Sequence, residues 1–176
     1  RGILDYDNPM EWIDDSSYDE GDSGETFVGE TFGRVNKPEA HKVMEVLQAY
    51  FGKIGKSRIL DESIDVGIIS PYRAQVHYLR HLIKKNVFFK PFRHLLSVNT
   101  VDGFQGQERD VIIVSLVRNN ADGQIGFLRD LRRMNVAMTR ARSKLIIIGD
   151  SHTLSRHPFY RLLYEYVKQT GSEDGV

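Results

Sequence analysis

Short apolar runs and longer stretches of helical periodicity alternate along this chain of 176 residues. Runs rich in apolar and β-branched residues predict strands at residues 10–13, 66–69, 97–101, 111–117 and 145–148. Apolar residues at helical spacing predict helices at residues 36–51, 72–85 and 158–168, and over at least the second half of residues 127–142. Strands separated by helices imply βαβ units. The sequence therefore predicts an α/β fold with a mostly parallel sheet covered by helices on both faces.

The start of the first long helix has the residues of a capping box. Asn36 is a good N-cap, Pro38 suits the first turn, and Glu39 stands three residues after the cap. An apolar stripe then follows on one face, at Val43, Val46, Leu47, Tyr50 and Phe51. This helix is expected to be structural.

Composition places the chain among ordinary soluble proteins. Hydrophobic residues make up 40% and charged residues 27%, and the length suits one well-formed core. The absence of cysteine excludes disulfides and thiolate metal sites. No apolar run approaches the ~18 residues of a membrane span, so no membrane partner is expected. The chain opens with Arg1 and lacks a secretory-type stretch, so we expect a cytoplasmic piece of a larger polypeptide.

Charge divides the chain unevenly, although the formal net charge is zero. Residues 1–30 hold ten acidic residues and a single basic one, Arg1, which leaves 14 acidic and 23 basic residues in the remainder. A basic body suits a polyanion such as nucleic acid or a nucleotide phosphate, although an ordinary solvated surface is the alternative. We therefore predict an acidic, partly flexible segment at 1–31 with a possible edge strand, a folded body at 32–170 and a tail at 171–176.

Three polar blocks adjoin predicted strands. Residues 67–75 read GIISPYRAQ, residues 100–113 read TVDGFQGQERDVII, and residues 135–142 read NVAMTRAR. This layout is expected to bring polar groups to the carboxyl edge of a sheet, where α/β folds bind phosphorylated ligands, with two arginines nearby. In this order the blocks resemble motifs IV, V and VI of superfamily 1 helicases. The resemblance covers residues 32–152 and points to the branch of the nonsense-mediated-decay, Dna-two and Sen-one types.

The resemblance implies a RecA-like (P-loop NTPase-type) fold and the second, C-terminal motor domain of an ATP-dependent helicase. ATP and Mg²⁺ would be its cofactors, and single-stranded DNA or RNA its substrate. In that family the P-loop lysine, the Mg²⁺ ligands and the catalytic glutamate belong to the first RecA-like domain. That P-loop domain, from the same polypeptide, is thus an expected partner, and the isolated chain is expected not to hydrolyse ATP.

The resemblance also assigns roles to single residues. In the catalytic set, Arg140 is the expected arginine finger and Arg142 a supporting residue. The expected ATP-binding residues are Gly106, Glu108, Arg73 and Gln75. The expected nucleic-acid contacts are Pro71, Tyr72, Thr100, Val101, Asp102 and Gln105. For Tyr72, stacking on a base and capping the sheet remain equal alternatives.

Helical geometry bears on the two arginines. If the helix continued through residue 142, Arg140 would lie about 200° from Met138, away from the apolar stripe, whereas Arg142 would lie nearer to it. Arg142 is therefore expected to make a salt bridge. His77 and His81 have the spacing of a helical metal pair, but no third ligand is evident, so both are expected to face solvent and no metal site is predicted.

A second function of a different class stays open at this point. The chain is alternatively a non-catalytic module that binds nucleic acid or another protein and keeps a helicase-like fold. The intact NVAMTRAR block favours the motor domain.

Overall fold

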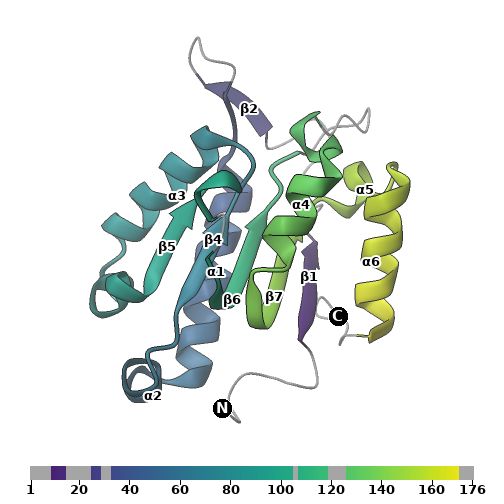
Figure 1. Ribbon diagram of the computed structural model, residues 1–176. Helices are drawn as coiled ribbons and strands as arrows, with labels where there is room; N and C mark the ends of the chain where they lie inside the picture. The colour runs from purple at the N-terminus through teal and green to yellow at the C-terminus, as the bar shows by residue number, and fades with distance from the viewer. Residues whose placement is uncertain (1–8, 15–24, 29–32, 105–106, 119–125, 171–176) are drawn as a thin grey trace.

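A parallel sheet forms the centre of the protein (Figure 1). The computed structural model describes residues 9–14, 25–28, 33–104, 107–118 and 126–170. The sheet contains five strands in the order β1-β7-β6-β4-β5, and all four neighbouring pairs are parallel. The strands are β1 (Met10–Asp14), β4 (Val66–Ile69), β5 (Leu96–Asn99), β6 (Arg109–Ser115) and β7 (Ala141–Gly149). The predicted α/β fold with a mostly parallel sheet is confirmed.

Helices connect these strands and cover both faces of the sheet. The α-helices are α1 (Lys37–Ile54), α2 (Lys56–Asp61), α3 (Arg73–Lys85), α4 (Leu131–Met138), α5 (Ser151–Leu154) and α6 (Pro158–Thr170). Three 3₁₀ segments join them, η1 (Val87–Leu95), η2 (Asp102–Phe104) and η3 (Gly126–Arg129). The sequence pattern missed α2, α5, η1 and an antiparallel hairpin of β2 (Glu25–Val28) and β3 (Gly33–Asn36). Among the described helices, none is long and apolar enough to cross a membrane.

Each face of the sheet has its own hydrophobic core. On one face, α1 and α3 pack the side chains of Leu47, Phe51 and Leu79 against β4, β5 and β6. On the other face, η2, α4 and α6 cover β6 and β7, with Phe104 and Tyr160 at most 1% exposed. The predicted stripe of α3 is buried, at Val76, Leu79 and Ile83, whereas His77 and His81 are exposed as expected.

The start of α1 follows the prediction only in part. Asn36 is the N-cap, and its side-chain oxygen accepts a hydrogen bond from the N–H of Glu39 at 3.0 Å. Glu39 does not complete a capping box. Its side chain is fully buried and accepts hydrogen bonds from the Ser115 hydroxyl at 2.5 Å and the Val117 N–H at 2.7 Å. The residue that was expected to cap a helix therefore ties α1 to the end of β6.

The helix predicted to run to residue 142 is wrong in its last turn. α4 ends at Met138, a turn follows, and β7 already begins at Ala141, opposite Arg109 of β6. The apolar run that signals this strand starts only at Leu145, because the first part of β7 is polar. Strand pairing, which periodicity along one segment does not report, sets the start of β7.

The edge strand β1 belongs to the same sheet as the body of the fold. Its residues pair in register with β7, from Met10 opposite Leu145 to Asp14 opposite Gly149. Lys144 of β7 is 3% exposed, and its ammonium group donates a hydrogen bond to the Glu11 carboxylate. The boundary drawn at residue 31 thus divides one sheet, although the wider domain limits stay predictions.

Candidate functional site at the two edges of the sheet

The block at residues 100–113 crosses one face of the sheet. Because β5 and β6 both run parallel to β4, the chain must return from the end of β5 to the start of β6. It returns through η2, where the ring of Phe104 is 1% exposed and lies against β4 at Gly67. A Cβ atom on Gly67 would stand 2.8 Å from Cε1 of Phe104, so only glycine leaves room for this crossing.

The crossing separates residues that were expected together at the carboxyl edge, where the strands end. Thr100 and Asp102 lie there, directly after β5, but Glu108 lies at the amino edge, where β6 begins. β6 has seven residues, and at ~3.3 Å per residue the two edges lie about 20 Å apart. The expectation of the carboxyl edge is therefore wrong for Glu108. The two arginines of residues 135–142, expected near that edge, lie at the amino edge, where β7 begins. Gln105 and Gly106 lie outside the described residues.

At the amino edge, the structure brings Glu108 and Arg140 together. The N–H of Arg109 donates a hydrogen bond of 3.0 Å to the carbonyl oxygen of Arg140, so the residues that begin β6 and β7 lie side by side. Glu108 is exposed and Arg140 is half-buried in the turn between α4 and β7. An acidic and a basic side chain that are 32 positions apart in the sequence thus share one edge.

One N–H group of the Arg140 guanidinium has no partner among the residues that the structure describes. It belongs to the Nε atom, which is buried. Guanidinium groups carry five N–H donors and remain charged, and a buried donor without an acceptor is costly. Because this Nε atom is enclosed, an anion would become its acceptor only if the Arg140 side chain turned outward.

Arg142 has a different role from Arg140, and it lies on β7 instead of on a helix. Its guanidinium makes ion pairs with Asp65 at 3.1 Å and with Asp110 at 3.4 Å. Partial burial of Arg142 disfavours its charge, but the two carboxylates outweigh that effect and raise the pKa of Arg142. The predicted salt bridge is confirmed, and Arg142 holds the starts of β6 and β7 together.

The block at residues 67–75 lies at the carboxyl edge, after β4. Pro71 is half-buried and Arg73 is exposed at the first turn of α3. Tyr72 is 3% exposed, and its hydroxyl oxygen accepts a hydrogen bond from Arg118 at 3.3 Å. Of the two alternatives for Tyr72, the buried ring supports capping of the sheet. Arg73 lies at the edge opposite Glu108, so the predicted ATP-binding set is divided.

Gln75 does not present its amide to a ligand in this structure. Its side chain is fully buried, accepts a hydrogen bond from the Asn36 N–H at 2.9 Å and donates one to the Asn36 carbonyl at 3.1 Å. It also donates to the Ser115 hydroxyl at 3.2 Å. These bonds engage the carbonyl oxygen and both N–H groups of the amide and make Gln75 a link between α1, α3 and β6, while the predicted ATP contact stays a prediction.

A strained turn follows β6 within the same buried network. Val117 has φ +70°, a left-handed conformation that a β-branched residue rarely adopts. The Arg118 N–H donates to the Leu116 carbonyl at 2.8 Å across it, which is the bond of a γ-turn. The Glu39 carboxylate and the Asn36 amide, which donates to the Val117 carbonyl at 2.9 Å, hold both polar groups of Val117. This turn directs Arg118 towards Tyr72.

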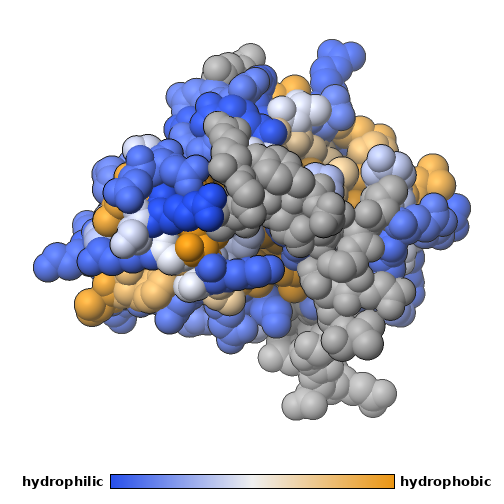
Figure 2. All heavy atoms as spheres, turned by 90° about the horizontal axis from the view of Figure 1, so that it is seen from below, coloured by the Kyte–Doolittle hydropathy of each residue, from blue (hydrophilic) through white to orange (hydrophobic). Residues whose placement is uncertain are grey.

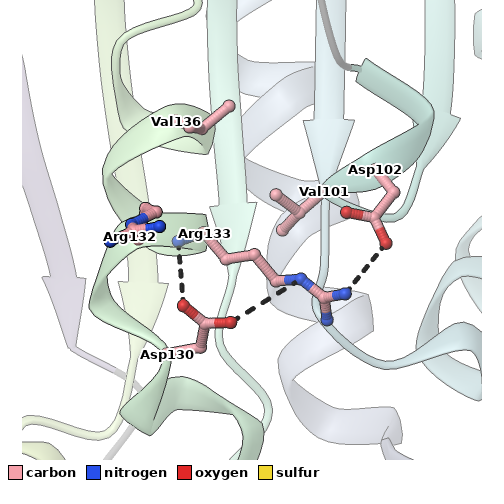
Figure 3. A pocket seen from close by; sticks show the side chains of 6 residues that line it. All are labelled: Val101, Asp102, Asp130, Arg132, Arg133 and Val136. Atoms are coloured by element: carbon pink, nitrogen blue, oxygen red, sulfur yellow. Dashed lines mark hydrogen bonds and ion pairs between the residues drawn. The ribbon is translucent and has the colours of Figure 1, made fainter.

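A pocket of about 280 Å³ opens between η2 and α4 at the carboxyl edge (Figure 3). We call it the α4 pocket, and its lining residues are Val101, Asp102, Asp130, Arg132, Arg133 and Val136. The side chain of Arg133 extends between Asp130 and Asp102 in Figure 3, with N–O distances of 3.8 and 3.1 Å. Two of the predicted nucleic-acid residues, Val101 and Asp102, thus line a pocket whose arginines come from α4.

Sequence reasoning did not select Arg132 and Arg133. Both are exposed on α4, while Met134 and Ala137 face the core. The adjacent pair of arginines before NVAMTRAR is the signal that was available in the sequence. Neighbouring residues on an exposed helix surface usually face solvent, however, and only the position of η2 gives this pair a concave surface.

Comparison with known proteins identifies related sequences over most of the chain. Residues 3–152 match the family described as "AAA domain". The chain is 42% identical over 141 residues to "Probable helicase MAGATAMA 3" of Arabidopsis thaliana, which covers 80% of this chain and 17% of that protein. It is 53% identical over 89 residues to "Helicase sen1" of Schizosaccharomyces pombe, covering 51% of this chain and 5% of that protein.

A third relative extends over almost the whole chain. "DNA replication ATP-dependent helicase/nuclease DNA2" of Mus musculus is 33% identical over 167 residues, which is 94% of this chain and 14% of that protein. The chain thus spans less than a fifth of the length of each of these three relatives. Together with the parallel sheet, the family match confirms the predicted RecA-like fold.

Proposed function

Because this chain belongs to the AAA domain family and is a superfamily 1 helicase domain of the Sen1 type, we propose that it is the second motor domain of an ATP-dependent helicase. In this role it contributes half of an ATP site and half of a track for single-stranded nucleic acid. The sequence contains no G-x-x-x-x-G-K-[ST] motif. A P-loop motor domain of the same polypeptide would supply that motif and the Mg²⁺ ligands.

The observation that carries the proposal is the placement of Glu108 and Arg140 on neighbouring strand starts at the amino edge. The two residue types fit ATP, since a carboxylate accepts hydrogen bonds from ribose hydroxyls and a guanidinium binds phosphoryl oxygens. The buried Nε of Arg140 lacks an acceptor within the described part of the chain, and a phosphoryl group would provide one when the side chain turns outward to the nucleotide. Bound ATP supplies the phosphoryl group that is transferred to water.

Arg140 would then act as an arginine finger. It stabilises the negative charge that develops on the phosphoryl oxygens, a contribution of roughly 10³–10⁵ in rate where such fingers have been measured. Arg142 positions the start of β7 through Asp65 and Asp110, and thereby holds the preceding turn that carries Arg140. Glu108 orients the nucleotide and is not itself a proton donor or acceptor in this scheme.

The test is single-turnover ATP hydrolysis by the two-domain protein in the presence of single-stranded nucleic acid, with Arg140→Ala compared with Arg58→Ala. Arg58 of α2 is also an arginine, but it pairs with Glu62, the residue that follows the helix, and contacts no proposed ligand. Arg140→Ala is expected to slow hydrolysis by about 10³-fold or more while affinity for nucleotide and strand is retained.

An unchanged rate in Arg140→Ala would contradict the finger. It would favour the alternative of a non-catalytic module that binds nucleic acid or protein. Arg58→Ala is expected to leave the rate within about twofold of the wild type, because an exposed ion pair contributes little. A large effect of that control would mean that the loss of any arginine impairs the protein.

A further inference from the structure

The α4 pocket contains two arginines that the proposed ATP site does not use. Arg132 and Arg133 come from consecutive positions of α4, and Val101 and Val136 provide apolar wall (Figure 3). The cavity of about 280 Å³ is several times larger than the ~30 Å³ that one water occupies. It is thus large enough for a sugar–phosphate unit, with cationic and apolar groups on its wall.

The two carboxylates of the pocket, Asp130 and Asp102, differ in how many interactions they make within the protein. Asp130 is the N-cap of α4, and its side chain accepts a hydrogen bond from the backbone N–H of Arg133 at 3.2 Å. Asp102 interacts, among the described residues, only with the guanidinium of Arg133. Asp102 is therefore the exchangeable partner, whereas Asp130 is needed by the helix.

Solvent exposure makes that exchange easy. The side chains of Arg133 and Asp102 are 52% and 67% exposed, and ion pairs at such exposure contribute little to stability. An arginine binds a phosphate through two parallel N–H···O bonds, which are stronger than a single exposed contact. A phosphate that enters the pocket can thus replace Asp102 at little cost to the fold.

We propose that the α4 pocket is a phosphodiester-binding subsite of the single-strand track, in which Arg133 exchanges Asp102 for a backbone phosphate. Arg132 provides a second cation, and Val101 and Val136 contact the sugar. In the absence of a strand, Asp102 occupies Arg133 and keeps η2 joined to α4. The inference rests on the proposed function, because it specifies how the same domain binds its nucleic acid.

The position of the pocket favours a strand over the nucleotide. Asp102 and the start of α4 lie towards the carboxyl edge, whereas Glu108 and Arg140 lie at the amino edge. Seven residues at ~1.5 Å each place Arg133 about 10 Å from Arg140 along α4 and the turn that follows it. Thr100, half-buried immediately after β5, lies next to the pocket residue Val101 on the same side. Contacts of this kind position a strand without reading its sequence.

The experiment measures binding of a fluorescent thymidine homopolymer, about 15 nucleotides long, to the full chain by anisotropy between 50 and 200 mM salt. The variants are Arg133→Gln, Asp102→Asn and the two combined. Arg58→Gln and Glu62→Gln are matched controls, because they change the net charge equally in another exposed ion pair, at 2.8 Å on α2. Thermal unfolding of each variant verifies that its fold is retained.

Arg133→Gln is expected to weaken binding about three- to tenfold and to reduce the slope of log affinity against log salt by about 0.7, the value for one phosphate contact on a single strand. Asp102→Asn is expected to tighten binding about threefold. In the combined variant the gain from Asp102→Asn should disappear, because Arg133 is no longer there to be released. The controls should change affinity by less than twofold.

Three results would overturn the inference. If Asp102→Asn and Glu62→Gln tighten binding equally, only net charge matters and the pocket is no subsite. If an ATP analogue displaces the strand and the pocket variants alter affinity for that analogue, the pocket belongs to the nucleotide. If the wild type binds the strand and none of the pocket variants changes its affinity, the inference fails while the proposed function stands. A wild-type chain that binds no strand would also overturn the inference, whereas the proposed function is tested separately in the two-domain protein.

Discussion

Glu39 is a fully buried carboxylate that receives hydrogen bonds from the Ser115 hydroxyl and the Val117 N–H. Burial of a charge is unfavourable unless hydrogen bonds compensate for it, and here the compensation also fixes the left-handed conformation of Val117. Gln75 is joined to the same residues through Ser115 and Asn36. At this scale, buried polar groups position the exposed ones that are proposed to bind ligands.

Glu39→Ala is expected to lower the free energy of unfolding by about 2–4 kcal/mol, because it leaves the Ser115 hydroxyl and the Val117 N–H without their acceptor. Urea unfolding followed by circular dichroism measures the change. The matched control is Glu45→Ala on the exposed side of α1, where Lys42 is 3.8 Å away, and it should stay within about 0.5 kcal/mol. Equal effects of both substitutions would contradict a specific role for Glu39.

At the scale of elements, the crossing of η2 over β4 positions the residues of both candidate sites. η2 crosses the sheet because Gly67 leaves space for the ring of Phe104, and this crossing determines which residues reach each edge. Seen from the side of α2, the described surface is mostly hydrophilic, with hydrophobic residues gathered towards both ends (Figure 2). The contacts that determine the positions of η2 and α4 lie in the interior.

Gly67→Ala is expected to destabilise the protein by about 1–3 kcal/mol, because the new Cβ would stand 2.8 Å from Phe104 and 2.9 Å from Ile112. It should also weaken strand binding, since η2 carries Asp102 of the α4 pocket. Gly52→Ala on α1 is the control. It meets no atom within 4 Å and should stabilise the protein by up to about 1 kcal/mol. Thermal unfolding of both variants tests the pair, and a tolerated Gly67→Ala would mean that the crossing adapts.

At the scale of the whole molecule, the proposed nucleotide and the proposed strand bind at opposite edges of the parallel sheet. Glu108 and Arg140 lie where strands begin, and the α4 pocket lies where strands end. α4 joins the two, because its N-cap Asp130 lies beside the pocket and its last residue, Met138, comes just before the turn of Arg140. A small shift of this helix would affect both sites. That geometry suits a domain that couples a nucleotide to a strand.

The separation predicts different kinetic effects for the two arginines in the two-domain helicase. Arg133→Gln should raise the strand concentration that gives half-maximal ATP hydrolysis by about three- to tenfold and leave the rate at saturating strand unchanged, because it removes binding in the ground state. Arg140→Ala should lower the saturated rate instead. Steady-state hydrolysis titrated with strand distinguishes them. A lower saturated rate in Arg133→Gln would show that Arg133 acts in the chemical step.

The sequence by itself determined the fold class, because the alternation of β-branched runs and helical stripes requires a parallel sheet covered on both faces. It also determined the family, since residues 67–75, 100–113 and 135–142 keep their order and spacing. The N-cap at Asn36 was predictable as well. Each of these properties depends on local spacing or on a local residue type.

Only the tertiary structure decided which residues share an edge. Glu108 and Asp102 are six positions apart in the sequence, yet the return of η2 across the sheet places them on opposite sides. The sequence resemblance makes Gln75 a ligand contact, but its amide forms buried hydrogen bonds to Asn36 and Ser115. Arg133 lines a pocket only because η2 packs beside α4. Strand pairing and burial join residues that are distant in the chain, so the periodicity of any one segment carries no information about them.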